Sequence, residues 1–397
     1  MIVVGGCYGE QCAHPPVDEL YGSGGRAAMA IAATGQKVEW HYYAPTDKQA
    51  DTALILSNPN LVHCAHNSEE AISFRYFQPL SRPVFSPRDP LPNTPFTVSG
   101  TTILRFGFME GEAIVHGDKV VFDPQSPHRP TPFSENGSTA KELAIVLNTK
   151  EVLVLGEAQE EHEAVTNILL KEKSAQVVLV KAGAEGCRVY DDGALIACIP
   201  PYQTEKVYKI GSGDIFSATF AYQWGVKGLR PEEAADIASR CTARYCETRS
   251  LSADIDDRAG QYIAALKHNK DAKIYVAGPF FTMAELWLVE EACTALFDLG
   301  VPFFSPYHHV GIGPPEKVVQ PDIEGLKDCT TVFAIIDGCD PGTMFEVGYA
   351  VSNNIPVVAL SQNPKTGDLT MLQGSDRCSI VDDFSTAIYR AAWESWS

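Results

Sequence analysis

The sequence predicts two α/β domains in succession, and three observations lead to that prediction. Short apolar, β-branched runs alternate with segments of helical periodicity, which is typical of parallel sheets covered by helices. The alternation stops at the polar stretch HNKDAK, residues 268–273, and starts again with IYVAG. The length of 397 residues is enough for two or three ordinary domains. We therefore expect one domain at residues 1–268 and a second at residues 272–397.

The first domain is expected to alternate strands with helices. MIVVGG opens as a strand, and GRAAMAIAATG indicates an Ala-rich helix that stops at Gly35. EVLVLG and AQVVLVKAG are continuous apolar runs, as expected for parallel strands that are covered on both faces. Helical periodicity is present in EEHEAVTNILLKE, RPEEAADIASRCTARYCE and AGQYIAALK. The stretch from Phe77 to Pro132 is rich in proline and short strands, which predicts a lid or a small sheet.

The second domain repeats the alternation. We expect strands at IYVAG, VPFFSP, TVFAIID and IPVVAL. We expect helices at AELWLVEEACTALFDLG, near DIEGLKDC, at GTMFEVGYAVSNN and at FSTAIYRAAWESWS. The acidic residues Asp322, Glu324 and Asp328 are expected on the solvated face of the second of these helices. This order of elements predicts a doubly wound parallel sheet.

Composition excludes several classes of function. The net charge is −19 and both halves of the chain are acidic, which argues against a nucleic-acid-binding surface or an anionic membrane patch. Eleven cysteines occur without CxxC or CxxH spacing, which predicts reduced thiols in a cytoplasmic protein. We expect no signal peptide, and no apolar run reaches the roughly 18 residues that a membrane span needs. Small-molecule substrates are the expected partners.

A glycine turn precedes a predicted helix in VYKIGSGDIFSATFAYQWG. Gly211, Ser212 and Gly213 allow a tight turn whose N–H groups, together with the helix dipole, form an anion hole suited to a phosphoryl group. Asp214 at the helix start is placed to accept a proton from an attacking hydroxyl. Taken alone, the same pattern also fits a simple turn with an Asp helix cap.

A carboxylate among small and apolar residues marks the second domain. In GCDPGTMFEVGYAVSNN, Pro341 stands at the first helical position and Asp340 is a candidate cap, which places Glu346 within about a turn and a half. The helix dipole there favours the ionised form by roughly 0.3–1 kcal/mol. An ionised carboxylate in an apolar pocket suits attack on an electrophilic carbon. The alternative is an exposed helix residue.

The ends of two predicted strands supply further candidates in this domain. Tyr275, Gly278, Pro279 and Phe280 lie in or after the strand IYVAG, and Asp337 and Gly338 end the strand TVFAIID. Ligands of open parallel sheets bind at the carboxyl ends of the strands, so we expect these residues at a substrate site. Phe280 either stacks on a base or is an ordinary core aromatic. We find too few potential ligands to predict a metal site.

Most of residues 1–265 resembles the ribokinase-like (PfkB) carbohydrate kinase family. The resemblance rests on GSGD, GSGGRAAMAIAATG, VVFDPQSP, LNTKE and VVLVKAGAEGCRVYDDG, in this order. It implies an α/β/α sandwich with a small lid, ATP with Mg²⁺, and phosphorylation of a sugar or nucleoside hydroxyl. By this resemblance Asp214 is the base, residues 211–213 form the anion hole, and Gly24 and Gly25 belong to the sugar-binding loop. Arg26 stands where the family usually has Asn, so it either binds a phosphorylated or otherwise anionic substrate or is a surface arginine. The alternative is a degenerate kinase fold that only binds ligands.

Residues 272–397 resemble the nucleoside 2-deoxyribosyltransferase family, through IYVAGPFF, FFSPYHHVG, DIEGLKDC, FAIIDG and DPGTMFEVGYA. The resemblance implies a flavodoxin- or Rossmann-like fold, no cofactor, and a homo-oligomer. It makes Glu346 the nucleophile that attacks the anomeric carbon of a nucleoside, assisted by Asp340.

Three functions follow from these patterns. The first is a two-domain enzyme of nucleoside or nucleotide metabolism that cleaves or transfers an N-glycosidic bond and phosphorylates or binds a sugar-containing partner. The second is a hydrolase of nucleotides or of NAD, regulated by a degenerate kinase-like domain. The third is a non-catalytic ligand-binding protein.

Overall fold

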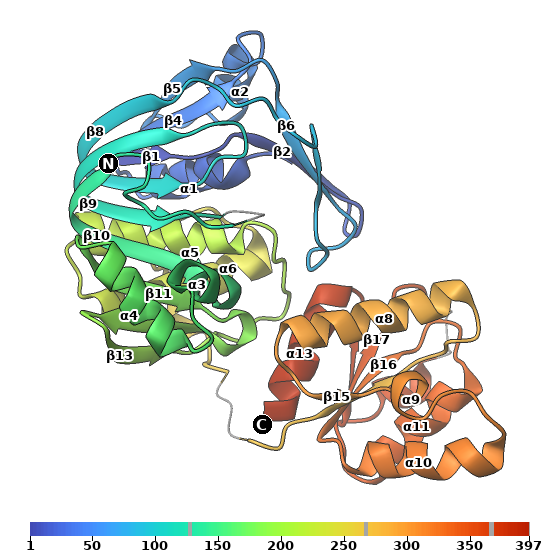
Figure 1. Ribbon diagram of the computed structural model, residues 1–397. Coiled ribbons are helices and arrows are strands. Elements are labelled where there is room, and N and C mark those ends of the chain that lie inside the picture. The colour runs from blue at the N-terminus through green and yellow to red at the C-terminus, as the bar shows by residue number, and fades with distance from the viewer. Residues whose placement is uncertain (126–128, 266–268, 365–368, 397) are drawn as a thin grey trace. The chain divides into compact units, whose positions relative to one another are not determined.

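The chain divides into two compact units, Met1–Ala264 and Ala265–Ser397 (Figure 1). The computed structural model describes residues 1–125, 129–265, 269–364 and 369–396. The predicted domain limits at residues 268 and 397 lie outside the described residues. Each unit mixes helices with a parallel-rich sheet, so the predicted α/β class is confirmed for both.

A nine-stranded sheet forms the centre of the first unit. Its strands stand in the order β13-β12-β11-β10-β9-β8-β1-β4-β5, and all neighbours are parallel except the β11–β12 and β12–β13 pairs. In chain order the strands are β1 (Ile2–Val4), β4 (Val38–Ala44), β5 (Leu61–Asn67), β8 (Phe96–Phe106), β9 (Ala113–Asp123), β10 (Thr139–Asn148), β11 (Ala175–Lys181), β12 (Cys187–Asp191) and β13 (Ala194–Ile199). The run AQVVLVKAG forms the buried strand β11, which is parallel to β10, as predicted, but antiparallel to β12.

Helices cover both faces of this sheet and complete an α/β/α sandwich. One hydrophobic core joins the sheet to α1, α5 and α6, and a second core on the opposite face joins it to α3 and α4. The helices of the unit are α1 (Gly22–Ala32), α2 (Gln49–Ile55), α3 (Thr149–Gly156), α4 (Glu161–Lys171), α5 (Ser212–Phe220) with a π-helical extension (Ala221–Val226), α6 (Pro231–Thr248) and α7 (Asp257–Gln261), with one 3₁₀ turn (Gly183–Glu185).

A four-stranded sheet stands beside the sandwich, but its position in the chain differs from the prediction. Its order is β3-β2-β6-β7, with β2 (Tyr8–Cys12), β3 (Val17–Leu20), β6 (Ile72–Tyr76) and β7 (Val84–Ser86) (Figure 1). The stretch from Phe77 to Pro132 supplies only β7 to it, and otherwise contains the central strands β8 and β9. The first halves of these two strands are partly exposed, so they contain no continuous apolar run that would have predicted long buried strands.

The prediction that EVLVLG is a strand is wrong, because these residues lie in α3. The Asn148 side chain accepts hydrogen bonds from the backbone N–H groups of Lys150 and Glu151, and the Glu151 carboxylate accepts one from Asn148 N–H. This capping box starts a helix. A short apolar run cannot distinguish a buried strand from a buried helix turn, and here the cap decides.

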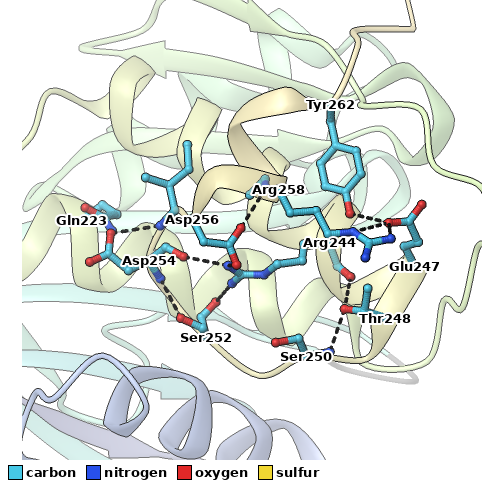
Figure 2. Close-up of polar contacts among 12 residues, drawn as sticks. Gln223, Arg244, Glu247, Thr248, Ser250, Ser252, Asp254, Asp256, Arg258 and Tyr262 are labelled. Carbon is cyan, nitrogen blue, oxygen red and sulfur yellow. Dashed lines mark hydrogen bonds and ion pairs between the residues drawn. The ribbon is translucent and has the colours of Figure 1, made fainter.

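A network around Arg244 of α6 holds the last segment of the first unit (Figure 2). The guanidinium, which is 3% exposed, donates to the carbonyls of Ser252 and Asp254 and pairs with Asp256 at 2.7 Å. The Asp256 side chain also caps α7, which ends at Gln261. The predicted helix AGQYIAALK is therefore wrong beyond Gln261, and its residues 266 and 267 lie outside the described residues.

We expect Arg244→Met to destabilise the first unit by about 2 kcal/mol, because it leaves two carbonyls without their charged donor. Asp256→Asn is the matched comparison: it removes only a half-exposed ion pair and keeps a capping side chain, so we expect a loss below about 1 kcal/mol. Pulse proteolysis in urea measures both values, and the surviving fragments show which unit unfolds. Equal losses in the two variants would contradict this account of Arg244.

The second unit contains a five-stranded, fully parallel sheet in the order β15-β14-β16-β17-β18. The strands are β14 (Ile274–Ala277), β15 (Phe303–Phe304), β16 (Thr331–Ile335), β17 (Val357–Leu360) and β18 (Cys378–Val381). Counted within the unit this is the order 2-1-3-4-5, that of doubly wound sheets, so the predicted fold class is confirmed. The order reverses between β14 and β16, the place where such sheets bind ligands.

The helices of the second unit lie on both faces of its sheet. A core on one face contains residues of α10, α11 and α12, while α8 and α13 pack on the other. Their bounds are α8 (Met283–Asp298), α9 (Pro306–His309), α10 (Pro315–Lys327), α11 (Pro341–Ser352), α12 (Thr370–Gln373) and α13 (Phe384–Trp396). None of the described helices has the length and apolar character that crossing a membrane requires.

Candidate active sites

A cavity of about 170 Å³ in the second unit lies between α10 and α11, against β14. The predicted nucleophile Glu346 and the predicted substrate residue Tyr275 both line it. The other lining residues are Val319, Asp322, Ile323, Leu326, Gly342, Phe345 and Tyr349. The cavity borders β14, one of the two strands between which the strand order reverses.

The Glu346 carboxylate is held in place from the floor of this cavity. The hydroxyl of Tyr275, a fully buried residue on β14, donates a hydrogen bond of 2.5 Å to Glu346 Oε1. Tyr275 in turn stacks on Phe304 with ring centroids 5.5 Å apart. The carboxylate is thus oriented by a rigid donor within a largely apolar wall, and its second oxygen is left to meet a ligand.

Burial raises the pKa of Glu346 to about 7, from an ordinary value near 4.5. The hydrogen bond from Tyr275 lowers it, while the charges of Asp322 and Asp340 raise it further. Burial therefore opposes the ionised form of Glu346 that the helix dipole is expected to favour. The shift corresponds to roughly 3 kcal/mol against the charged form, which exceeds a dipole effect that fades after the first turn.

Asp322 corrects a second expectation. It does not lie on a solvated face, because it lines the cavity with Glu346 and its buried Oδ1 has no hydrogen-bond partner among the described residues. Burial raises the pKa of Asp322. The cavity thus contains two carboxyl groups whose protonation burial favours.

The predicted assistants of Glu346 have local structural partners. Oδ2 of Asp340 accepts hydrogen bonds from both the backbone N–H and the hydroxyl of Thr343, which is a helix cap. Asp337 accepts from Ser361 Oγ and from the N–H groups of residues 362 and 363, so it fixes the loop after β17. Neither aspartate lines the cavity. Their roles in catalysis and in substrate binding remain predictions.

The turn after β14 also lies outside the cavity lining. A Cβ on Gly278 would approach Ile335 to 3.1 Å, so this glycine serves close packing. Pro279 is buried, and Phe280 has its ring centroid 5.4 Å from that of Tyr307. Gly338 follows β16 with a φ of +81°. These four predicted substrate residues surround the carboxyl ends of β14 and β16 without reaching the cavity.

In the first unit, the glycine turn before α5 has the predicted geometry but is covered by an arginine. Gly211 is the cap residue of α5 with a φ of +78°. A Cβ placed on it would lie 2.2 Å from Nε of Arg26. Both the positive φ and the lack of space for a side chain therefore favour glycine here. Ser212 is buried at the start of the helix. The Lys181 ammonium lies 3.5 Å from where a Cβ on Gly213 would be.

Arg26 joins the predicted catalytic base to a second carboxylate. Its guanidinium, 1% exposed, donates to Asp214 Oδ2 at 2.7 Å and binds both oxygens of Glu10. The other oxygen of Asp214 accepts from Gln125 Nε2, also at 2.7 Å. Burial raises the pKa of Glu10, and the charge of Arg26 opposes this shift. Both oxygens of the predicted base are therefore engaged.

A cavity of about 330 Å³ lies over this ion pair, beneath the four-stranded sheet. Strands β2 and β6 contribute aromatic and acidic side chains to it, Tyr8, Glu10, Phe74 and Tyr76, above Gly211 and Asp214. Gly24 and Gly25 are closely packed, because Cβ atoms there would lie 2.2 Å from the Gly5 carbonyl and 3.0 Å from Trp40. Their role in sugar binding stays a prediction.

A third charged group lies beside α5. Lys181 Nζ donates to Asp123 Oδ2 at 2.8 Å, and Ser217 Oγ donates to the same oxygen at 2.7 Å. Asp123 is fully buried and its Oδ1 has no hydrogen-bond partner in the part of the chain that the structure describes. The charges of Asp123 and Glu151 raise the pKa of Lys181 against the effect of burial.

Sequence reasoning missed Glu10, Gln125, Asp123 and Lys181 in the first unit and Asp322 in the second. Asp123 and Lys181 end the strands β9 and β11, so the rule that parallel sheets bind ligands at strand carboxyl ends would have found them. Glu10 lies on an unpredicted small sheet, and Asp322 lies on a helix whose charged residues looked alike.

Comparison with known proteins finds one family match in each unit. The model of the pfkB family carbohydrate kinases matches residues 115–258, and that of the nucleoside 2-deoxyribosyltransferases matches residues 274–379. Both resemblances seen in the sequence are thereby confirmed, as is the ribokinase-like fold of the first unit. No curated protein matches the chain significantly.

Three solved structures illustrate the likeness of the first unit. Phosphofructokinase-2 from Escherichia coli with fructose-6-phosphate is 13% identical, with a TM-score of 0.46 and coverage of 66% of this chain and 97% of that one. A pyrophosphate-dependent kinase of the ribokinase family, bound to a pyrophosphate analogue and myo-inositol, is 14% identical with a TM-score of 0.44. The match covers 64% of this chain and 98% of that one. Fructokinase from Vibrio cholerae O395 is 13% identical with a TM-score of 0.45, and the match covers 63% of this chain and 94% of that one.

Proposed function

We propose that this protein is a cytoplasmic two-domain enzyme of nucleoside or nucleotide metabolism. Its chain joins a segment similar to pfkB kinases to one similar to nucleoside 2-deoxyribosyltransferases. Its second unit cleaves or transfers an N-glycosidic bond through Glu346. The observation that carries this proposal is the Glu346 carboxylate oriented by Tyr275 in the wall of a cavity. No other described carboxylate of this unit combines a position in the cavity with an orienting donor.

The chemistry is a double displacement. An oxygen of ionised Glu346 attacks the anomeric carbon, the C–N bond breaks, and the base leaves with a proton while a glycosyl ester remains on the enzyme. A second base, or water, then attacks the same carbon and releases Glu346. Two displacements restore the starting configuration, as in retaining glycosidases. Asp340 is proposed to assist at the sugar hydroxyls or in protonating the base, and Asp322 is a second candidate donor.

An assay separates transfer from hydrolysis. The full chain is incubated with nucleosides, nucleotides and NAD, with and without a free acceptor base, and the products are separated by chromatography. Base release that requires the acceptor supports a transferase, and release without it supports a hydrolase. If no substrate is cleaved under any condition, the catalytic proposal for the second unit is refuted and the ligand-binding alternative holds.

We expect Tyr275→Phe to move the pH profile of cleavage. Glu346 acts when ionised, so the rate rises with pH through its pKa of about 7. The Tyr275 hydrogen bond lowers that pKa, so its loss moves the rise to higher pH, by about one unit. Tyr349→Phe, which changes another tyrosine of the cavity, is expected to leave the midpoint in place. A profile unchanged in Tyr275→Phe would contradict the assignment.

For the first unit we propose binding of a sugar-containing ligand in the 330 Å³ cavity, with Asp214 as the base of any phosphoryl transfer. The residues present fit a phosphate donor: the α5 N-terminus and Lys181 offer positive charge, and the orphaned Asp123 Oδ1 offers an acceptor for a metal-bound water. ATP with Mg²⁺, when bound, supplies the phosphoryl group. Gly211, Ser212 and Gly213 would orient it.

The Arg26–Asp214 ion pair favours the second function, in which this unit regulates an N-glycoside hydrolase. Each oxygen of Asp214 already accepts a hydrogen bond, one from Arg26 and one from Gln125, so a substrate hydroxyl must compete with these donors for the carboxylate. Release of ADP from ATP, measured with sugars and nucleosides in the wild type and in Asp214→Asn, decides between the two. Turnover that Asp214→Asn abolishes supports a kinase. No turnover, with ligand-dependent cleavage by the second unit, supports regulation.

A homo-oligomer is part of the proposal. The resemblance of the second unit implies active sites shared between subunits, and exposed apolar side chains on and next to α8 support it: Phe281, Met283 and Phe297 are 73%, 89% and 75% exposed. A monomer in light scattering at working concentration would contradict it.

A further inference from the structure

Three potential metal ligands meet at the β5 edge of the nine-stranded sheet, and none of them lines the 330 Å³ cavity of this unit. On β4, Trp40 belongs to the core shared with α1, so the alternating Glu39 and His41 project from the opposite face. The parallel register pairs His41 directly with Cys64 on β5. Residues 23 positions apart in the sequence therefore become neighbours on one surface.

The geometry suits a single metal ion. One carboxylate oxygen of Glu39, one ring nitrogen of His41 and the sulfur of Cys64 all lie within 4.8 Å of one another. His41 Nε2 lies 4.0 Å from Glu39 Oε2. Tetrahedral zinc, with bonds of roughly 2.0–2.3 Å, needs ligand atoms about 3.3–3.6 Å apart. Glu39 is exposed, so a small rotation of its side chain closes the set.

His41 presents the nitrogen that such a site needs. Its Nε2 is buried and makes no hydrogen bond within the described part of the chain. Its Nδ1 lies 3.2 Å from Nε2 of His66, and the His66 ring stacks on Phe96 with centroids 3.6 Å apart. A histidine whose second nitrogen is held by a fixed partner is the usual arrangement of metal-binding imidazoles.

The charges around the cluster are compatible with a divalent cation. Burial lowers the pKa of His41 and of His66, so both imidazoles stay neutral, which is the ligating form. Burial and the charge of Glu39 raise the pKa of the Cys64 thiol, so a bound metal must displace its proton. A carboxylate and a thiolate then neutralise the ion. The amino group of Met1 also interacts with Glu39.

We propose that Glu39, His41 and Cys64 bind one zinc-class ion, with water at the fourth position. A thiolate and an imidazole select Zn²⁺ over Mg²⁺ or Ca²⁺. The ion would link the edge strand β5 to β4. This site was not expected from the sequence, because the chain has no CxxC or CxxH spacing and the strand register brings His41 next to Cys64.

Cobalt provides the test, because a cobalt–thiolate bond has a charge-transfer absorption. Metal-free full-length protein is titrated with Co²⁺, then with Zn²⁺. We expect the band to saturate at one Co²⁺ per chain, to disappear when Zn²⁺ replaces it, and to be absent in Cys64→Ser. His41→Gln is expected to weaken Co²⁺ binding at least about 100-fold, and His66→Gln about 10-fold. Cys198→Ser, which changes an exposed cysteine of β13, keeps the band.

A measurement on the unmodified chain covers the case in which Cys64→Ser fails to fold. Iodoacetamide labelling of the native protein, read by peptide mass spectrometry, should slow at Cys64 when Zn²⁺ is added and stay unchanged at exposed Cys198. Absence of the cobalt band in the wild type, its persistence in Cys64→Ser, or equal labelling of Cys64 with and without Zn²⁺ would each overturn the proposal.

Discussion

Glu346→Gln is expected to lower the rate of N-glycosidic cleavage by roughly 10³-fold or more, the scale on which loss of a covalent nucleophile acts. The amide keeps the shape of the side chain and can still meet the Tyr275 hydroxyl, but it cannot form the glycosyl ester. The rate is measured by base release from the best substrate found in the nucleoside and NAD screen. Glu316→Gln, at an exposed position in the first turn of α10, is the matched control and should retain the wild-type rate.

The covalent intermediate gives an independent readout. Rapid acid quenching of the wild type followed by peptide mass spectrometry should show a glycosyl adduct on the peptide that contains Glu346, and none in Glu346→Gln. Glu346→Ala should behave as Glu346→Gln does. Cleavage at the wild-type rate in either variant would remove Glu346 from the mechanism, whatever the fold of the second unit.

Arg26→Ala is expected to destabilise the first unit by about 3–5 kcal/mol. The guanidinium is 1% exposed and lies between Glu10 and Asp214, whose side chains are 10% and 11% exposed. Its removal leaves two buried carboxylates side by side with no cation, which costs far more than an exposed ion pair. It also removes a cation that lies 5.2 Å from the Tyr21 ring. Pulse proteolysis in urea measures the loss for this unit alone.

A neutral triple variant separates charge from packing. Replacing Glu10 by Gln, Arg26 by Met and Asp214 by Asn removes every charge of the cluster while keeping side-chain volume. Replacing a buried ion pair by uncharged side chains of similar volume often leaves the stability of a protein unchanged or raises it. We therefore expect the triple variant to recover most of the stability lost in Arg26→Ala. If it is as unstable as Arg26→Ala, the arginine acts through packing and the buried-charge argument fails.

The sequence predicted the class of both folds, because the alternation of apolar runs with helical periods can be recognised without knowing the tertiary structure. It also located α5 and α11 with their first-turn residues, since Gly211 needs a positive φ and Pro341 with Asp340 marks a helix start. It failed at EVLVLG, where four apolar residues fit either element and the cap at Asn148 decided. It also failed for β8 and β9, whose exposed first halves lack a continuous apolar run.

The sequence by itself determined which residues carry unusual chemistry: a carboxylate in an apolar helix, an aspartate after a glycine turn, an arginine after two glycines. Only the tertiary structure decided what those groups meet. Tyr275 reaches Glu346 across 71 positions and Arg26 reaches Asp214 across 188. Hydrogen bonds and burial at such separations depend on sheet order and helix packing. For that reason the local sequence did not predict the raised pKa of Glu346 or the hydrogen bonds to Asp214. Nor did it predict the cluster of Glu39, His41 and Cys64.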